Sequence, residues 1–261
     1  YVLRHNLSNG HTCLPADKLI PTTMQLLQVG EEAVKDVLAS MTSSFTVKQE
    51  EMEGRRFLFL NHLHQAERFI AARIRLMTGF PPVANPYIEA GIYAIERSNH
   101  IRYEGQQRLA ITEAVEKGTL ILTGGPGTGK TTTLRAIITL LEGMGESVAI
   151  AAPTGRAAKR IAELTGCEAK TIHRLLEVQW DDEENPIFAR NEKNPLDADA
   201  LVVDELSMVD VLLFENLLRA LKSGCRLILV GDTDQLPAVG PGSLLHDLID
   251  SAVMPVVQLT E

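Results

Sequence analysis

From residue 119 onward, short apolar runs alternate with stretches whose apolar residues recur at helical spacing. Leu201-Val202-Val203 and Arg226-Leu227-Ile228-Leu229-Val230 are nearly continuous apolar runs, as expected for strands that are covered on both faces. This alternation predicts an α/β fold in which crossover helices flank a parallel sheet. The predicted strands are 119–123, 147–152, 200–204 and 225–230, and the predicted helices are 130–142, 155–165, 208–222 and 242–250.

The first 80 residues follow a different pattern. Three segments have the spacing of amphipathic helices, and two alternate as strands around the turn signal Glu53-Gly54. We therefore predict a smaller helical, winged-helix-like domain over 1–80, with a plain structural α+β module as the alternative. Prolines after Gly79 cannot continue a helix, so we expect a connector and a helix over 81–100 and the α/β domain over 101–261. The helical segments are 16–29, 31–43 and 64–77, and the strands are 45–49 and 56–60.

A glycine-rich segment separates the first predicted strand from its helix. Gly124-Gly125-Pro126-Gly127-Thr128-Gly129-Lys130-Thr131 fits the pattern G-x-x-x-x-G-K-[ST] without a mismatch. Glycines let the backbone approach an anion, and free N–H groups at a helix start attract it. We expect Lys130 to contact the β- and γ-phosphates of ATP as a catalytic group, and the Thr131 hydroxyl to ligate Mg²⁺. The other predicted nucleotide contacts are Gly125, Pro126, Gly127, Thr128, Gly129 and Thr132.

Polar residues follow two later strands at the same expected edge of the sheet. Asp204 and Glu205 come directly after Leu201-Val202-Val203; we expect Asp204 to hold Mg²⁺ and the nucleotide, and Glu205 to act as general base toward the attacking water. Gln235, in the segment 229–237, is predicted to sense the γ-phosphate or position that water. Asp232 in the same turn has an ordinary turn or capping role as its alternative.

Two further segments carry candidate contacts. Gln107, on a helix before the first strand, offers the donor and acceptor that an adenine edge needs, although a lone glutamine on a helix is usually a surface residue. The segment 151–160 ends a strand and starts a helix with Thr154 as N-cap, which forms a second anion site. Nucleic-acid phosphate is the expected guest. The predicted single-stranded DNA contacts are Pro153, Thr154, Arg156 and, with less weight, His173.

Composition narrows the ligands, metal sites and cellular locations that are expected for this chain. A net charge of −9 argues against a surface that binds polyanions everywhere, although part of the acid is concentrated in Asp181-Asp182-Glu183-Glu184. The three cysteines are scattered without a C-x-x-C pair, which favours a reducing, cytoplasmic location and argues against structural zinc. No apolar run approaches a membrane span. The chain starts at Tyr1 and stops at Glu261, so we expect a fragment of something longer.

These motifs, in this order, resemble those of superfamily 1 helicases. Their amino-acid sequences are similar to those of RecD-type (exodeoxyribonuclease V alpha subunit-like) helicases. GGPGTGKTTT resembles motif I, APTGRAAKR motif Ia, VVDELSM motif II and GDTDQLPAVGPG motif III, while Gln107 falls at the adenine-reading glutamine. The N-terminal part is more loosely similar to long free-standing RecD-like proteins.

The resemblance implies ATP-driven 5′→3′ translocation on single-stranded DNA with duplex unwinding, in repair or recombination. It also implies that 101–261 is the first of two RecA-like motor domains. One local departure is Leu206, where relatives usually have a small residue; we expect altered packing only. The rivals are a P-loop kinase or GTPase, for which no lid or guanine-reading element is visible, and a nucleotide-dependent binding module that hydrolyses ATP only incidentally.

Overall fold

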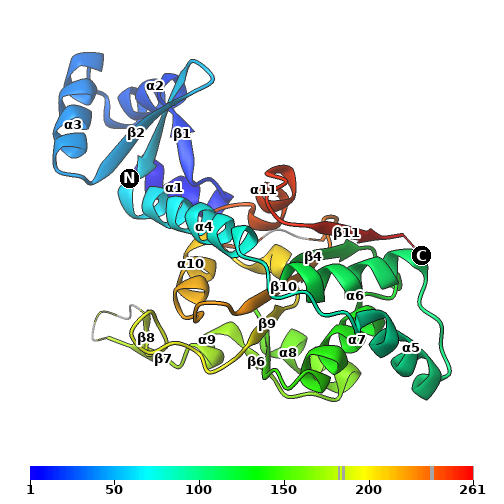
Figure 1. Cartoon of the computed structure of the whole chain (residues 1–261). Helices are drawn as coiled ribbons and strands as arrows, with labels where there is room; N and C mark the ends of the chain where they lie inside the picture. The colour runs from blue at the N-terminus through cyan, green and yellow to red at the C-terminus, as the bar shows by residue number, and fades with distance from the viewer. Residues whose placement is uncertain (182, 184–185, 236–237, 261) are drawn as a thin grey trace.

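A six-stranded sheet with the order β11-β4-β10-β9-β5-β6 forms the centre of the α/β domain (Figure 1). The computed structural model describes residues 1–181, 183, 186–235 and 238–260. All the strand pairings in this sheet are parallel, as the sequence predicted. The strands are β4 (Thr119–Gly124), β5 (Val148–Ala152), β6 (Ala169–Thr171), β9 (Ala200–Val203), β10 (Arg226–Gly231) and β11 (Val256–Leu259).

Helices cover both faces of the sheet, and alternate strand residues enter two separate hydrophobic clusters. Ile121 of β4 packs on the face covered by α10 and α11, whereas Leu120 and Leu122 pack on the face covered by α5, α6 and α7. This alternation follows from the two-residue side-chain period of a strand. The helices are α5 (Ile88–Asn99), α6 (Gly105–Lys117), α7 (Lys130–Gly143), α8 (Gly155–Thr165), α9 (Ile172–Leu175), α10 (Val211–Arg219) and α11 (Leu244–Asp250).

One predicted helix begins later than expected. The prediction 208–222 was wrong at its start because Leu206–Met208 forms a separate 3-10 turn and Asp210 caps α10. The Asp210 carboxylate accepts the Leu213 N–H at 2.9 Å. Leu206 itself is fully buried and joins the hydrophobic cluster beneath α10 and α11, in keeping with the packing role expected of it.

A short hairpin lies beside α9 and was absent from the sequence prediction. It consists of β7 (Val178–Trp180) and β8 (Pro186–Phe188), paired antiparallel across the acidic run. Asp182 and Glu184 of that run lie outside the described residues. Trp180 is 63% exposed, so its side chain is not packed into the protein core.

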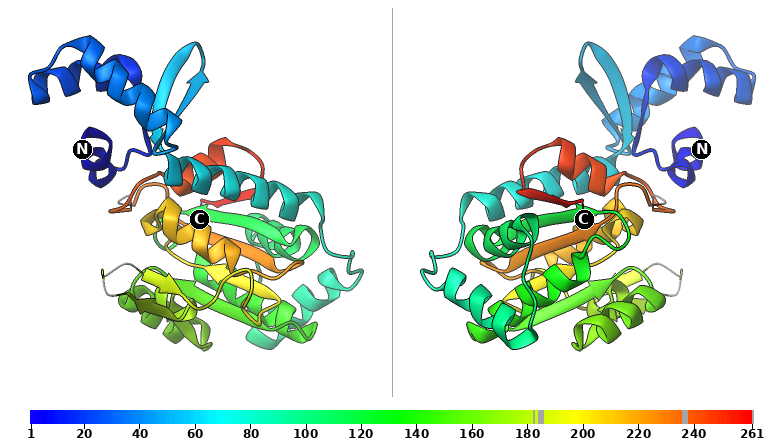
Figure 2. Two further views of the ribbon diagram at one scale, coloured as in Figure 1. Left: turned by 90° about the vertical axis from the view of Figure 1, so that its left-hand side faces the viewer. Right: turned by 90° about the vertical axis from the view of Figure 1, so that its right-hand side faces the viewer.

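The N-terminal unit projects away from the large sheet (Figures 1 and 2). It contains a three-stranded antiparallel sheet of order β1-β3-β2 and a small core of its own around Leu19, Val47 and Leu58. The unit is thus a small module of helices and an antiparallel sheet, and its winged-helix-like character stays a prediction. Its elements are α1 (Val2–His5), β1 (Cys13–Pro15), α2 (Ala16–Leu27), α3 (Glu31–Ser43), β2 (Val47–Met52) and β3 (Arg55–Leu60).

Helix α4 (Asn61–Gly79) joins the two parts of the chain. Its buried residues Ala66, Ile70 and Ile74 belong to the same hydrophobic cluster as α10, although the helix falls in the range 1–80 assigned to the N-terminal domain. A second connection is a backbone hydrogen bond of 2.9 Å from the Gly242 N–H to the Gly10 carbonyl. In the described residues, no helix is long and apolar enough to cross a membrane.

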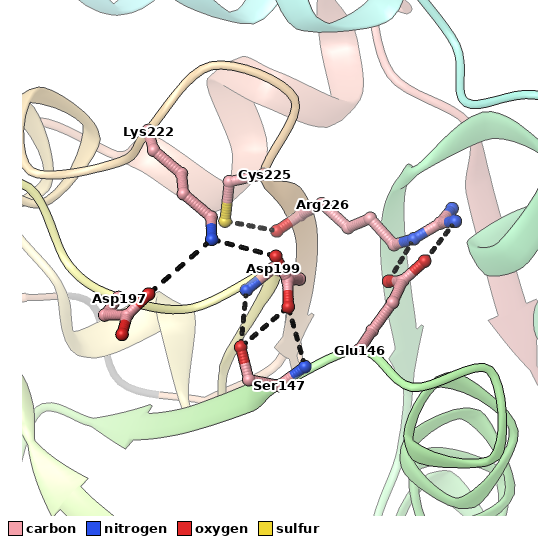
Figure 3. A network of polar contacts seen from close by, with 7 residues as sticks. All are labelled: Glu146, Ser147, Asp197, Asp199, Lys222, Cys225 and Arg226. Atoms are coloured by element: carbon pink, nitrogen blue, oxygen red, sulfur yellow. Dashed lines mark hydrogen bonds and ion pairs between the residues drawn. The ribbon is translucent and has the colours of Figure 1, made fainter.

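Polar side chains tie together the loops at the amino-terminal edge of the sheet (Figure 3). Arg226 forms a two-pronged ion pair with Glu146, at 2.6 and 2.7 Å. Beside it, Asp199 accepts hydrogen bonds from Ser147 and from Lys222, whose ammonium lies 2.8 Å away. The Lys222 ammonium and the Ser147 donors hold the pKa of Asp199 well below its usual range. These contacts fix the strand starts far from the phosphate loop.

Candidate nucleotide and nucleic-acid site

The phosphate loop joins β4 to α7 through glycines that other residues could not replace. Gly124 has φ +148° and Gly129 has φ +85°, and a methyl group on Gly124 would overlap the Leu259 carbonyl oxygen. Thr128 Oγ1 donates to the Gly125 carbonyl at 2.9 Å, which closes the loop. Lys130 begins α7, and its Nζ donates to the carbonyl oxygens of Gly125, at 2.7 Å, and Gly124. The lysine ammonium is therefore held against carbonyl oxygens of the loop.

Two aspartates from neighbouring strands face this lysine. Burial lowers the pKa of Lys130, while the negative charges of Asp232, after β10, and Asp204, after β9, act against that shift. Asp232 is 3% exposed, and its Oδ1 accepts the Asp234 N–H at 3.0 Å. Asp232 thus stabilises its turn, which is the ordinary turn role given as its alternative in the sequence analysis. It also lies close enough for its charge to act on Lys130.

Asp204 and Glu205 directly follow the end of β9. The Asp204 N–H donates to the Ala151 carbonyl at 2.9 Å, and the Asp204 carboxylate accepts the Glu205 N–H at the same distance. Glu205 adopts φ +53°, a left-handed conformation that is uncommon for a non-glycine residue and marks functional sites. Burial raises the pKa of Asp204; burial and then the Asp204 charge raise the pKa of Glu205. A carboxylate with a raised pKa is better suited to accept a proton.

The donors near Lys130 suit a magnesium ion bound together with a nucleotide. Asp204 supplies a buried carboxylate at the end of β9, and Thr131 supplies a hydroxyl in the first turn of α7. Hard oxygen donors are what Mg²⁺ prefers, and it is usually held by only one or two protein groups plus phosphates and water. Over the described ranges, no group of three or more His, Cys, Asp or Glu residues is placed to hold a metal. The residues present therefore fit a nucleotide-bound Mg²⁺ rather than a protein-only metal site.

Gln107 lies at the phosphate loop. It occupies the first turn of α6, where its Oε1 accepts the Glu104 N–H at 3.0 Å in a capping box. Its Nε2 lies so close to Gly129 that a methyl group there would overlap it. The structure thus places the predicted adenine-reading side chain beside the loop, with one of its two polar atoms already engaged in capping.

The candidate DNA contacts begin at the adjoining strand end. Thr154 caps α8 as predicted, its Oγ1 accepting the Ala157 N–H at 3.2 Å, and Pro153 beside it is partly buried. Arg156 is exposed, and its positive charge lowers the pKa of Glu205, so this arginine lies near the nucleotide residues. The His173 ring centroid lies 6.2 Å from that of Phe188 on the hairpin, which is a structural contact.

Arg160 was not among the predicted site residues. Its charge acts on Lys130, Asp204 and Glu205 together. The signal was present in the sequence, because Arg160 follows Arg156 by four residues and therefore shares its helix face. Gln235 is exposed after β10, and its N–H donates to the Asp232 carbonyl at 3.2 Å. Leu236 and Pro237, in the same predicted segment, lie outside the described residues.

A parallel sheet, a phosphate loop and two acidic strand ends together define a P-loop ATPase domain, and residues 107–241 match the family model described as an AAA domain. The chain belongs to this family and, within it, to the RecD-like superfamily 1 DNA helicases. P-loop domains bind nucleotides, which is the chemistry that the loop geometry supports.

Three similarities illustrate the relationship. The chain is 38% identical over 209 residues to the ATP-dependent RecD2 DNA helicase of Deinococcus radiodurans, covering 80% of this chain and 28% of that protein. It is 36% identical over 219 residues to the RecBCD enzyme subunit RecD of Mycobacterium tuberculosis, covering 75% and 36%. The solved Pif1 helicase from Candida albicans is 26% identical, with a TM-score of 0.44, over 62% of this chain and 40% of that one. The chain spans about a third of the length of these two curated relatives.

Proposed function

We propose that this chain carries the first of two motor domains of an ATP-dependent helicase that translocates 5′→3′ along single-stranded DNA. The observation that carries the proposal is the convergence of Lys130 with Asp204 and Asp232 at one edge of the sheet. Phosphoryl transfer needs a cation at the phosphates, a metal carboxylate and a group that orients water. The RecD2 relative, whose name includes ATP-dependent DNA helicase, supports the assignment of a helicase function.

Each residue has a separate role in this proposal. Lys130 neutralises the β- and γ-phosphates, Thr131 and Asp204 hold Mg²⁺, and Glu205 takes a proton from the attacking water. Bound Mg²⁺ supplies charge neutralisation at the phosphate oxygens. Gln235 senses the γ-phosphate from an exposed turn, and Gln107 contacts adenine from beside Gly129. The other loop residues and Thr132 bind phosphate through backbone and hydroxyl groups.

The DNA strand is proposed to cross the start of α8. Free N–H groups at a helix N-terminus and a nearby arginine bind phosphate without regard to base sequence. Pro153, Thr154 and Arg156 lie there, and His173 follows on α9. Because Arg156 also acts on Glu205, the proposed DNA contact and the proposed base are adjacent. That adjacency gives a physical route by which DNA binding can change ATP turnover.

The test compares two variants in the complete protein. Lys130→Ala removes the cation at the phosphates and is expected to abolish both tight nucleotide binding and hydrolysis. Glu205→Gln is expected to keep nucleotide binding and lose turnover, because only the proton acceptor is lost. Nucleotide affinity by calorimetry and ATP hydrolysis with and without single-stranded DNA decide the matter. Full activity in Glu205→Gln would refute the base assignment, and unwinding of 5′-tailed against 3′-tailed duplexes tests the direction.

The isolated chain gives a second measurement. An arginine supplied from a second domain contributes about 10³–10⁵ in the rate of phosphoryl transfer, whereas nucleotide binding rests mainly on the loop, the lysine and the metal. We expect residues 1–261 to bind ATP with Mg²⁺, hydrolyse it very slowly and show little stimulation by DNA. Robust DNA-stimulated turnover by this chain alone would contradict the two-domain proposal. Binding without any hydrolysis in the complete protein would instead favour a nucleotide-dependent binding module.

A further inference from the structure

A cavity of about 430 Å³ lies at the amino-terminal edge of the large sheet. The end of α4, the proline-rich connector, the end of α6 and the turn before β10 enclose it. Thr119 and Arg226, the first residues of β4 and β10, contribute to its lining. The length of β4, roughly 17 Å, therefore separates the cavity from the phosphate loop at the other end of the strand. No residue of the proposed nucleotide or DNA site lines it.

The walls of this cavity are held in place by protein contacts. Pro82 of the connector packs on Gly118 so closely that a methyl group at position 118 would lie 2.7 Å from the Pro82 Cγ. Arg73 of α4 reaches across and donates from Nη2 to the Leu221 carbonyl at 2.8 Å. The cavity is thus preformed, which lowers the ordering cost of binding a ligand.

The charged side chains that line the cavity are all cationic. Arg226 is neutralised by Glu146, toward which it points in Figure 3. Lys117 forms no ion pair within the described chain, and Arg73 donates to the backbone carbonyls of Leu221 and Lys222. No carboxylate is among the lining residues, all of which the structure describes. The cavity therefore carries uncompensated positive charge that favours an anionic group.

Two buried polar atoms at the cavity lack hydrogen-bond partners. They are Thr119 Oγ1 and Arg73 Nε, and Thr119 is only 2% exposed. Few buried polar groups in native proteins stay unpaired, because the lost hydration is not repaid. Neither atom has accessible surface, so a ligand in the cavity would contact neither of them directly.

The rim of the cavity is apolar and open to solvent. Leu76, Phe80 and Val83 are 51%, 77% and 93% exposed, respectively, and they lie together on α4 and the connector. Exposed large apolar side chains that gather beside a pocket indicate an interaction site. Because this rim extends beyond the enclosed volume, it suits a chain that continues out of the cavity better than a small free metabolite.

We propose that this cavity binds the carboxyl-terminal residue of a partner polypeptide that ends in a large apolar side chain. The terminal carboxylate would pair with Lys117 and with the guanidinium group of Arg73. The apolar side chain would lie against Leu76, Phe80 and Val83. Charge complementarity and the mixed cationic and apolar lining are what select this ligand chemistry.

The test uses N-acetyl-leucyl-phenylalanine as the probe, titrated into the full chain by calorimetry, beside the same dipeptide with an amidated terminus. We expect the free acid to bind and the amide to bind at least about tenfold more weakly, because a charge-assisted pair is lost. Lys117→Gln should weaken the free acid by about tenfold and leave the amide unchanged. Val83→Asp should weaken both probes and the free acid more, because it adds a negative charge at the rim.

Lys117 and Val83 are exposed, so both variants are expected to keep the melting temperature of the parent chain. Lys48→Gln, on the exposed edge of the small sheet, is the matched control and should leave probe binding unchanged. ATP affinity should be the same in all these variants. Three results would each overturn the proposal: equal binding of acid and amide, affinity unchanged by Lys117→Gln and Val83→Asp, or no binding of either probe at about 10 mM.

Discussion

The side-chain amide of Gln107 lies directly against the backbone of Gly129, the residue that caps α7 after the phosphate loop. The contact joins the first turn of α6 to the loop that is proposed to hold the phosphates. A side chain at position 129 would have to displace the Gln107 amide, in addition to the cost of the left-handed backbone there. Steric fit and backbone conformation can therefore be separated by experiment.

Gly129→Ala is expected to weaken ATP binding at least about tenfold more than Gly127→Ala. Both glycines have similar positive φ values, +85° and +82°, so both alanines incur a backbone cost of about 1–2 kcal/mol. Only the alanine at 129 would also displace Gln107, because no atom of the described residues lies within 4 Å of a methyl group at 127. Calorimetric titration with ATP and Mg²⁺ measures the difference. In a Gln107→Ala background the two variants should become equivalent, and a persistent gap would place the clash elsewhere.

Arg160→Ala is expected to move the acidic limb of the ATPase pH profile upward. Arg160 lowers the pKa of Glu205 more than Arg156 does, so its removal makes the Glu205 carboxylate harder to ionise. A general base must be deprotonated, and activity on the acidic side should therefore fall. The measurement is a pH–rate profile of the complete protein. Lys159→Ala is the control, because Lys159 is exposed and pairs with Glu163 at 3.9 Å. Identical profiles for the parent and Arg160→Ala would contradict this arrangement.

Arg156→Ala is expected to weaken single-stranded DNA binding and to reduce the slope of log affinity against log salt by about 1. Thr154→Ala should have a smaller effect on DNA and cost about 1 kcal/mol of stability through the lost helix cap. Basal ATP hydrolysis without DNA should change little. Fluorescence anisotropy over a salt series measures the slope. An unchanged slope together with collapsed hydrolysis would reassign Arg156 to the nucleotide site, to which it already lies close.

Glu146→Ala is expected to destabilise the chain by about 3 kcal/mol, because it leaves the Arg226 guanidinium buried without its partner. The Arg226 side chain is 6% exposed and that of Glu146 20%, so solvent screens the pair only weakly. Urea unfolding measures the loss. Glu31→Ala is the matched control, since its pair with Lys35 is exposed and worth only a few tenths of a kcal/mol. Equal losses in the two variants would show that burial does not strengthen the Arg226 pair.

Local signals predicted the elements well where the hydrophobic period was clear and the helix start carried a cap or acidic residues. Helices 155–165 and 31–43 match α8 and α3 from end to end, and the first is capped by Thr154 as expected. The parallel sheet was also predicted, because its central strands are continuous apolar runs. The short edge strands β6 and β11 were missed, since three or four residues carry too little periodicity and are specified by pairing with distant strands.

The sequence identified most residues of the candidate site, but it did not show which of their side chains lie close to one another. The motifs identified Lys130 and Asp204, and parallel topology explains why strand ends meet at one edge. Which side chain faces which is a question of helix phase and backbone conformation. Arg160 reaches the carboxylates through the phase of α8, and Glu205 through a left-handed φ. The left-handed φ of Glu205 does not follow from its residue type. The four-residue spacing of Arg156 and Arg160 indicates a shared helix face but not what that face meets, so both relationships needed the three-dimensional structure.

The double role of α4 also determines where the chain can be cut. Its apolar face closes the cluster beneath α10, and Arg219 lies over the Phe69 ring, 3.9 Å from the ring centroid. A motor shortened to begin at residue 81 would leave that face of α10 bare, with an apolar strip open to self-association. One that begins at Asn61 keeps the helix and loses only the N-terminal unit. Any comparison of the motor with and without that unit should therefore use the second boundary, because the first would report on aggregation.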